Sequence, residues 1–256
     1  MRLNTVPRIG AVCLAALIVS GCARSLPLIS HAHIGHALTA WRDTPGEAGL
    51  FVVAEQEAEI ALAQASLAVQ AKGKPITTKR HIANVAHALS PDAHPQGTGL
   101  GYGAIRALRS AADHITFSAE SGDASANIVT GAAHFVEAAD AVVKRFQVAL
   151  EIAQVARLAN ASELPGLAAE LEQLTRTSIH GEDLNNDGIV GSKIEEFGLE
   201  QLRTALSDMI GNEKPAYHPL GRQYLFGLVR LPNGGWAYRF DSSGDPPTSG
   251  YGQYER

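Results

Sequence analysis

Apolar and small residues recur along most of the chain at alternating steps of three and four positions. The clearest stripe lies within 124–159 and contains Ile128, Ala132, Phe135, Ala139, Val142, Phe146, Ala149, Ala153 and Ala156. This spacing places the side chains on one face of an α-helix, and at 1.5 Å per residue the stripe covers about 50 Å. Because many members are alanine, neighbouring helix axes can approach closely. The sequence therefore predicts a long helix packed in a bundle.

The same period appears in shorter segments on both sides of this stripe. We expect further helices over about 47–72, 78–90, 103–120 and 163–178, and a last helix that follows a loop at 181–192 and runs to Ile210. Breaks rich in glycine, proline or serine separate these segments. Short connections between long helices favour antiparallel neighbours. The predicted fold is mainly α, with an antiparallel four-helix-type bundle at 46–160 and a helix-loop-helix at 161–212.

The chain changes character near its C-terminus. Segments 224–230 and 236–240 are rich in β-forming residues, and the residues between them contain Asn233-Gly234, a common hairpin turn. The sequence therefore predicts a short β-hairpin within 213–240. The last residues, 241–256, are rich in Gly, Ser, Pro and Tyr and are expected to form a flexible tail. On composition alone, the hairpin and the tail are the parts we consider for docking of a protein partner.

The first 21 residues have the pattern of a secretory signal. Arg2 and Arg8 supply a positive start, an apolar run covers 9–19, and small residues follow. The apolar run is too short to cross a membrane as a helix, which needs about 20 residues. We expect residues 1–21 to be removed as a signal peptide.

The tetrapeptide Val-Ser-Gly-Cys that ends at Cys22 resembles the lipobox of bacterial lipoproteins. The resemblance implies that Cys22 carries lipid, including palmitate, and anchors the protein to a membrane of the cell envelope. Residues 22–45 are then a lipid tether with a histidine cluster. Ala23 follows the cysteine, which by resemblance to Gram-negative lipoproteins implies the outer membrane, facing the periplasm. The other cysteine, Cys13, lies in the leader, so the mature chain has no pair for a disulfide.

Composition and motifs mainly exclude certain classes of function. The formal net charge is −5, and it becomes −7 if Arg2 and Arg8 leave with the leader. No basic stripe is present, so nucleic acid is not an expected partner. The chain has neither a His-Glu-x-x-His nor a Gly-x-Ser-x-Gly motif. The glycine-rich stretch 97–103 follows a proline rather than a strand, and we interpret it as a helix-helix loop. These observations favour a protein that is not an enzyme.

The sharpest chemical motif lies at 183–190, between two predicted helices. Asp183, Asn185 and Asp187 place oxygen side chains at alternate positions, and Gly188 permits a tight turn. Over about 165–211, this arrangement resembles the loops of EF-hand and dockerin-like calcium proteins. The resemblance implies a calcium site formed by these three side chains, the carbonyl of Ile189 and a later carboxylate.

The later carboxylate departs from the pattern. The twelfth loop position, where EF-hand loops have a bidentate carboxylate, is occupied by Ile194. Glu195 or Glu196 then has to supply the ligand, and we assign it to Glu195. We expect weak affinity, in the range of about 10⁻⁴ to 10⁻³ M found in extracellular modules. The alternative is a polar connection with Asx turns and no ion.

Histidines are concentrated in the first half of the chain, where eight of the ten lie between positions 31 and 134. Imidazole suits copper, zinc, nickel and haem iron. His33 and His36 would share a face if their segment is helical. The candidate ligands comprise this N-terminal group and one histidine from each of three predicted helices: His31, His33, His36, His81, His114 and His134. The alternative is that these histidines are solvated or singly hydrogen-bonded.

Two functions from different classes follow. The first is a non-enzymatic, membrane-anchored helical scaffold or binding protein of the cell envelope, with a structural calcium site. The second is a bundle that takes up or handles copper, zinc, iron or haem through the histidines of the N-terminal half. An enzyme without a recognisable motif ranks third.

Overall fold

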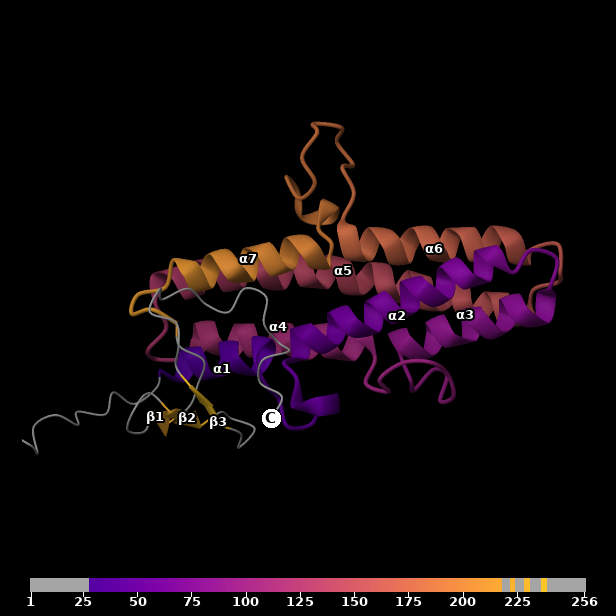
Figure 1. The fold of residues 1–256 in the computed structure, drawn as a ribbon. Helices are drawn as coiled ribbons and strands as arrows, with labels where there is room; N and C mark the ends of the chain where they lie inside the picture. The colour runs from indigo at the N-terminus through magenta and orange to yellow at the C-terminus, as the bar shows by residue number, and fades with distance from the viewer. Residues whose placement is uncertain (1–27, 218–221, 224–227, 231–235, 239–256) are drawn as a thin grey trace, which may run out of the picture.

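The structure, a computed structural model, describes residues 28–217 and the short segments 222–223, 228–230 and 236–238. This part of the chain is mainly helical, as predicted (Figure 1). Its α-helices are α1 (Ile29–Leu38), α2 (Leu50–Gln70), α3 (Pro75–Leu89), α4 (Ala104–Glu120), α5 (Ala126–Leu158), α6 (Leu164–His180) and α7 (Leu199–Gly211). Two 3₁₀-helices, η2 (Pro45–Glu47) and η3 (Ile194–Glu196), lie in the connections.

Helices α2 to α7 agree with the predicted segments to within a few residues. The longest, α5, was expected over 124–159. It begins directly after Ser125, whose hydroxyl accepts a hydrogen bond from the backbone nitrogen of Ile128. This contact is an N-cap, which satisfies one of the free amides of the first turn. Every position of the predicted stripe is buried. The helical period was therefore a sufficient guide to this element.

Helix α5 runs along the whole bundle, and the other helices pack around it (Figure 1). Helix α5 packs directly on α3, α4, α6 and α7, helix α2 packs on α3, α4 and α6, and α1 packs on α4 and α2. The bundle thus contains more than the four helices predicted at 46–160. The helix-loop-helix expected at 161–212 also packs on α5, and its apolar residues belong to the same hydrophobic core.

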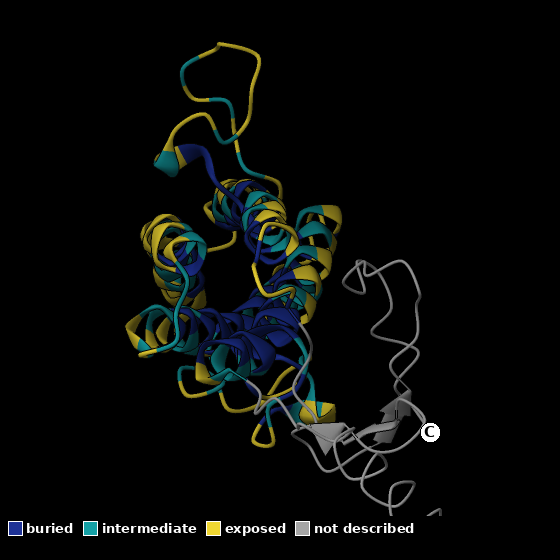
Figure 2. Ribbon diagram, turned by 90° about the vertical axis from the view of Figure 1, so that its left-hand side faces the viewer, coloured by how far each residue is buried: buried dark blue, intermediate teal, exposed yellow. Residues whose placement is uncertain are grey.

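The core combines many alanines with a few large side chains. Figure 2 shows the buried faces of the helices turned toward one another. In α2, Ala58, Ala61 and Ala65 have no exposed surface. Where space remains between α2 and α5, the rings of Phe51 and Phe135 pack edge to face with centroids 5.9 Å apart. Small residues therefore allow close helix packing, and aromatic rings fill the wider places.

Helix α1 lies in the segment that was expected to form a tether. Small residues and histidines occupy all its sides, so no one-sided apolar stripe marks it in the sequence. Its start lacks a side-chain cap of its own. Instead Asp123, from the turn between α4 and α5, accepts hydrogen bonds from the backbone nitrogens of Ile29 at 2.6 Å and Ser30 at 3.0 Å. A carboxylate there also interacts favourably with the helix dipole.

The glycine-rich stretch forms a loop, as predicted, and a buried carboxylate holds it. Glu57 of α2 has no exposed surface. Its oxygens accept hydrogen bonds from the backbone nitrogens of Leu100 at 3.0 Å, Tyr102 at 2.9 Å and Gly103 at 2.9 Å. Gly103 has φ +87°, a backbone conformation that favours glycine. Glu57 therefore fixes the end of the loop and the start of α4.

Near the C-terminus, three short segments pair in antiparallel order: β1 (Arg222–Gln223), β2 (Leu228–Arg230) and β3 (Trp236–Tyr238). The turn predicted at 231–235 and the tail at 241–256 lie outside the described residues. The same holds for the signal peptide and Cys22. The hairpin as a unit, the tail and the lipid anchor therefore stay predictions.

Candidate metal centre

Three histidines from two helices meet at the seam between α1 and α4. His33 and His36 lie about one turn apart on α1, and His114 lies on α4. Their ligand nitrogens are all within 4.8 Å of one another, and Nδ1 of His33 is 3.1 Å from Nδ1 of His114. This is the only such group of three histidine, cysteine or acidic side chains within the part of the chain that the structure describes. The spacing of three residues puts the first two on one face, and helix packing adds the third.

Two aromatic rings pack against this three-histidine cluster. The indole of Trp41 lies with its centroid 4.7 Å from the rings of both His36 and His114. The ring of Phe117 lies 5.6 Å from His33 and 5.8 Å from His114. The three histidines and Trp41 are half-buried. The imidazoles therefore lie in an aromatic environment with limited access to water.

The sequence analysis did not identify these two aromatic residues as part of a site. Phe117 follows His114 by three positions, so helical spacing on α4 was a usable signal for it. Trp41 lies beyond the end of α1, and only the turn that follows the helix brings its indole beside the cluster. No spacing rule applies to a residue in such a turn.

The environment keeps the imidazoles neutral. The pKa of His36 is lowered to about 4, first by burial and then by repulsion from His114 and His33. Burial, with repulsion from His33, lowers the pKa of His114 to about 4 as well. Burial also lowers the pKa of His33, although the charge of Asp123 opposes this. Neutral imidazole is the form that binds metals. Nδ1 of His36 is buried and has no hydrogen-bond partner among the described residues.

The other three candidate histidines lie elsewhere and have their own partners. Nε2 of His31 is 3.5 Å from Oε1 of Glu213. His81 is hydrogen-bonded at 2.9 Å to a glutamine of α2. The ring of His134 packs edge-on against Phe197 at 5.2 Å. None of the three belongs to the cluster, so they fit the alternative of singly satisfied histidines.

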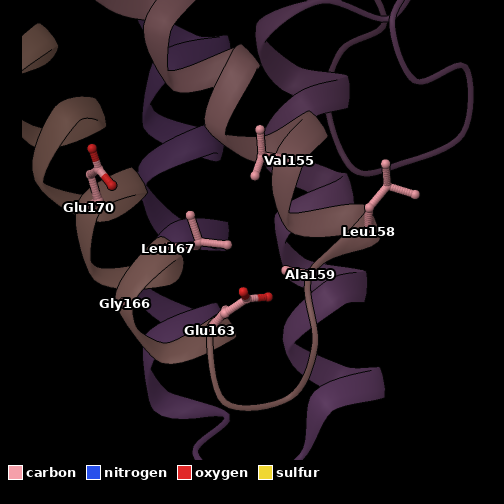
Figure 3. Close-up of a pocket in the computed structure, with 7 residues that line it drawn as sticks. All are labelled: Val155, Leu158, Ala159, Glu163, Gly166, Leu167 and Glu170. Carbon is pink, nitrogen blue, oxygen red and sulfur yellow. The ribbon is translucent and has the colours of Figure 1, made fainter.

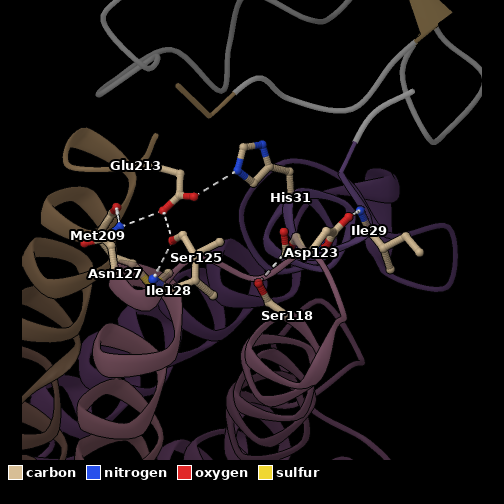
Figure 4. A network of polar contacts seen from close by, with 10 residues as sticks. Ile29, His31, Ser118, Asp123, Ser125, Asn127, Ile128, Met209 and Glu213 are labelled. Atoms are coloured by element: carbon tan, nitrogen blue, oxygen red, sulfur yellow. Dashed lines mark hydrogen bonds and ion pairs between the residues drawn. The ribbon is translucent and has the colours of Figure 1, made fainter. Parts of the chain in front are cut away.

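His31 takes part in a buried polar network that ties α1 to the ends of α5 and α7 (Figure 4). Oε2 of Glu213 accepts hydrogen bonds from Ser125 and Asn127, both at 2.7 Å. Asp123, which caps the start of α1, lies at the same end of the bundle. Burial opposes ionisation of Asp123, but hydrogen bonds from the first residues of α1 outweigh it and lower its pKa. The network therefore holds in place the helix that carries two of the three clustered histidines.

The predicted calcium-type loop extends away from the bundle between α6 and η3 (Figure 1). Its oxygen side chains turn back on the loop. Asp183 accepts hydrogen bonds from the backbone nitrogens of Gly188 at 2.8 Å and Asp187 at 3.2 Å, and Oδ1 of Asn185 accepts one from Asp187 at 2.9 Å. Gly188 has φ +85°, as its place in the motif requires. Hydrogen bonds from Ser192 and Asn185 lower the pKa of Asp187, so it is ionised at neutral pH.

The carboxylate that contacts this loop in the structure is Glu196, the neighbour of the predicted ligand Glu195. Glu195 is exposed, and Glu196 is fully buried. Oε2 of Glu196 accepts hydrogen bonds from the backbone nitrogens of Ser192 at 2.9 Å and Lys193 at 3.2 Å. The reason is local: Glu196 is the third residue of η3, and its side chain folds back to the N-cap as in a capping box. Its other oxygen, Oε1, is buried without a hydrogen-bond partner in the described chain.

A groove at the other end of the bundle offers no comparable chemistry. It lies between the end of α5 and the start of α6 and is lined by Val155, Leu158, Ala159, Glu163, Gly166, Leu167 and Glu170 (Figure 3). Its surface is mainly apolar, and neither histidine nor cysteine is among the lining residues. We therefore assign no site to it.

Comparison with known proteins does not place the chain in a family. No protein-family model matches it, and no curated protein or solved structure matches it significantly. The function therefore has to be argued from the side chains themselves.

Proposed function

We propose that this protein binds a transition-metal ion through His33, His36 and His114. The observation that carries the proposal is the convergence of three neutral imidazoles within 4.8 Å. Ligands placed tetrahedrally at 2.0–2.1 Å from a zinc ion lie about 3.3 Å apart. The nitrogens of His33 and His114 are already 3.1 Å apart. These two nitrogens are hydrogen-bonded to each other, so a metal ion would replace this hydrogen bond and its proton while the rings move little.

The arrangement favours a single ion that is carried or stored. The short distance between His33 and His114 leaves no room for a haem between them. For zinc, three protein ligands leave one coordination position open, an arrangement that catalytic zinc sites also have. The cluster consists of histidines only, with no carboxylate to act as a general base. Because no carboxylate joins the group among the described residues, the ligand set supports metal handling over hydrolysis.

The proposal is tested by metal binding to the full chain, purified in detergent without a histidine tag. We expect one equivalent of zinc, copper or nickel by elemental analysis after dialysis. Losing a group that only orients a ligand already costs about 10- to 100-fold in affinity, so His114→Ala should cost at least as much. His81→Ala, outside the cluster, is the matched control. Unchanged metal content in both His114→Ala and His36→Ala would refute the proposal.

We further propose that the site is held near a membrane of the cell envelope by lipid on Cys22. The support is the leader and lipobox-like sequence. Five residues, 23–27, separate Cys22 from Leu28, and at full extension the six steps between these two Cα atoms span about 20 Å. The described residues include no helix with the length and hydrophobicity needed to cross a bilayer. Mass spectrometry of protein isolated from cells should find Cys22 acylated at the new N-terminus; an intact leader would contradict this.

A second candidate function is weak calcium binding in the loop that starts at Asp183. The favouring observation is that Glu196 is buried beside the loop with Oε1 unpartnered. Its Oε2 and an oxygen of Asp187 already share the hydroxyl of Ser192, at 3.0 Å and 2.8 Å. A cation there would gain two carboxylates. Because Asn185 and Asp187 would have to give up hydrogen bonds within the loop, we expect the affinity to be low.

Calcium binding is tested by thermal unfolding. With a Kd of about 10⁻³ M, 10 mM calcium stabilises the folded state by about 1.4 kcal/mol, or roughly 3 to 6 °C in Tm. Asp187→Asn and Glu196→Gln should abolish this shift. Glu195→Gln should retain it, since that side chain is exposed. A shift that survives in Glu196→Gln but disappears in Glu195→Gln would return the ligand to Glu195 and contradict this assignment.

A further inference from the structure

We propose that the three-histidine cluster selects copper in its monovalent state over divalent zinc, with the indole of Trp41 as one wall of the site. This inference rests on the proposed metal binding and adds the identity of the ion. It is carried by two observations: the ligand set has no negative charge, and the indole of Trp41 packs against two of the three ligands.

The charge of the ligand set discriminates between ions. All the clustered ligands are imidazoles, so a bound ion keeps its full charge. The free-energy cost of moving an ion from water into a less polar medium grows with the square of its charge, about fourfold from a monovalent to a divalent ion of similar size. The cluster is half-buried, so this difference in transfer cost applies to an ion bound there. Neutral ligands therefore favour the monovalent ion.

The number of ligands also favours monovalent copper over zinc. Zinc completes a tetrahedron with a fourth ligand. Within the described residues, no fourth histidine, cysteine or acidic side chain joins the group. Monovalent copper is stable with three ligands. The site is therefore complete for copper, while zinc would have to retain a water molecule.

The aromatic wall adds an attraction for a cation. The face of an aromatic ring carries partial negative charge, and among the aromatic side chains tryptophan attracts cations most strongly. The indole of Trp41 contacts His36 and His114 at equal centroid distances of 4.7 Å. It is therefore adjacent to two of the three ligands. The attraction is larger where water is partly excluded, as it is around this half-buried ring.

The affinities are measured on the full chain by competition with a chromogenic copper(I) chelator, under nitrogen with ascorbate, and with a zinc indicator. We expect one copper(I) per chain and copper(I) binding at least about tenfold tighter than zinc, which is 1.4 kcal/mol. Trp41→Leu should weaken copper(I) binding by about 2- to 30-fold, while the Tm of the metal-free protein stays unchanged if the fold is intact. Trp41→Phe should fall between, because it keeps an aromatic face. Unchanged copper(I) affinity in Trp41→Leu, or zinc binding as tight as copper(I) binding in the unaltered chain, would overturn the inference.

Fluorescence gives a second readout. The chain has two tryptophans, Trp41 and Trp236, so in Trp236→Phe all the indole emission comes from Trp41. Copper(I) should change this emission in a 1:1 titration, and the change should be lost in His36→Ala. If no metal binds, the proposed function itself fails. If zinc binds through the histidines but copper(I) does not, the proposed function stands and only this inference is overturned.

Discussion

Replacing Glu57 by alanine is expected to lower the free energy of unfolding by about 3 to 5 kcal/mol, because each buried donor left without a partner costs about 1 to 3 kcal/mol. The Glu57 carboxylate is completely buried and accepts hydrogen bonds from three backbone amides of the loop that leads into α4. Alanine can replace none of these bonds. It also leaves a cavity between α2 and the loop, which adds to the loss.

Urea denaturation measures this effect as a shift in the midpoint at constant slope. Glu57→Gln keeps one carbonyl acceptor and the shape of the side chain, so its loss should be smaller than that of alanine. Glu59→Ala, on the exposed side of the same helix, is the matched control and should change stability by no more than about 0.5 kcal/mol. A loss below 1 kcal/mol in Glu57→Ala would show that water can satisfy these amides, contrary to our description of the loop.

Replacing Arg145 by methionine should lower the free energy of unfolding by about 3 kcal/mol, since a hydrogen bond to a charged group contributes about 1.5 to 3 kcal/mol. The Arg145 guanidinium donates to the backbone carbonyls of Thr177 at 2.6 Å, Glu195 at 3.0 Å and Phe197 at 2.6 Å. Burial lowers its pKa, but a guanidinium stays charged. One side chain of α5 thus joins the end of α6 to the exit of the calcium-type loop.

Methionine keeps much of the arginine volume, so this variant removes mainly the hydrogen bonds. Lys144→Met is the matched control, because Lys144 is the exposed neighbour of Arg145 on α5. Hydrogen exchange should show loss of protection at η3 and the start of α7, with little change in α2 and α3. Uniform loss across the bundle would indicate that Arg145 stabilises the whole core instead of this junction.

Helix α1 is central to the proposed metal site. This helix carries His33 and His36, and its first backbone amides are capped by Asp123. The buried contact between His31 and Glu213 ties the same helix to the end of α7. A metal ion at the cluster would cross-link α1 to α4 through His114. Metal binding should therefore stabilise mainly the end of the bundle nearest the proposed lipid anchor.

Helix α1 also shows which kind of helix local sequence patterns do not predict. The predicted helices were recognisable because their buried faces repeat every three or four residues, as α5 shows. In α1 the apolar positions are not confined to one side. The cap of its first turn, Asp123, lies 94 positions from Ile29 in the chain. No short window of sequence contains both, so the helix was missed.

The residues by themselves determined the mainly helical fold, the shared face of His33 and His36, and the turn at Gly188. These properties depend on backbone geometry over a few residues, and that geometry follows from residue type and spacing. The same holds for the alanine-rich faces, which are buried where their period predicts.

Only the tertiary structure decided which side chains meet. The distances between helices selected His114, and not His81 or His134, as the partner of the α1 histidines. The placement of Glu196 is local by comparison, because it follows from its position three residues after the N-cap of η3. The contact between His33 and His114 depends on how two helices pack, and a sequence separation of 81 residues produces no periodic pattern in the sequence.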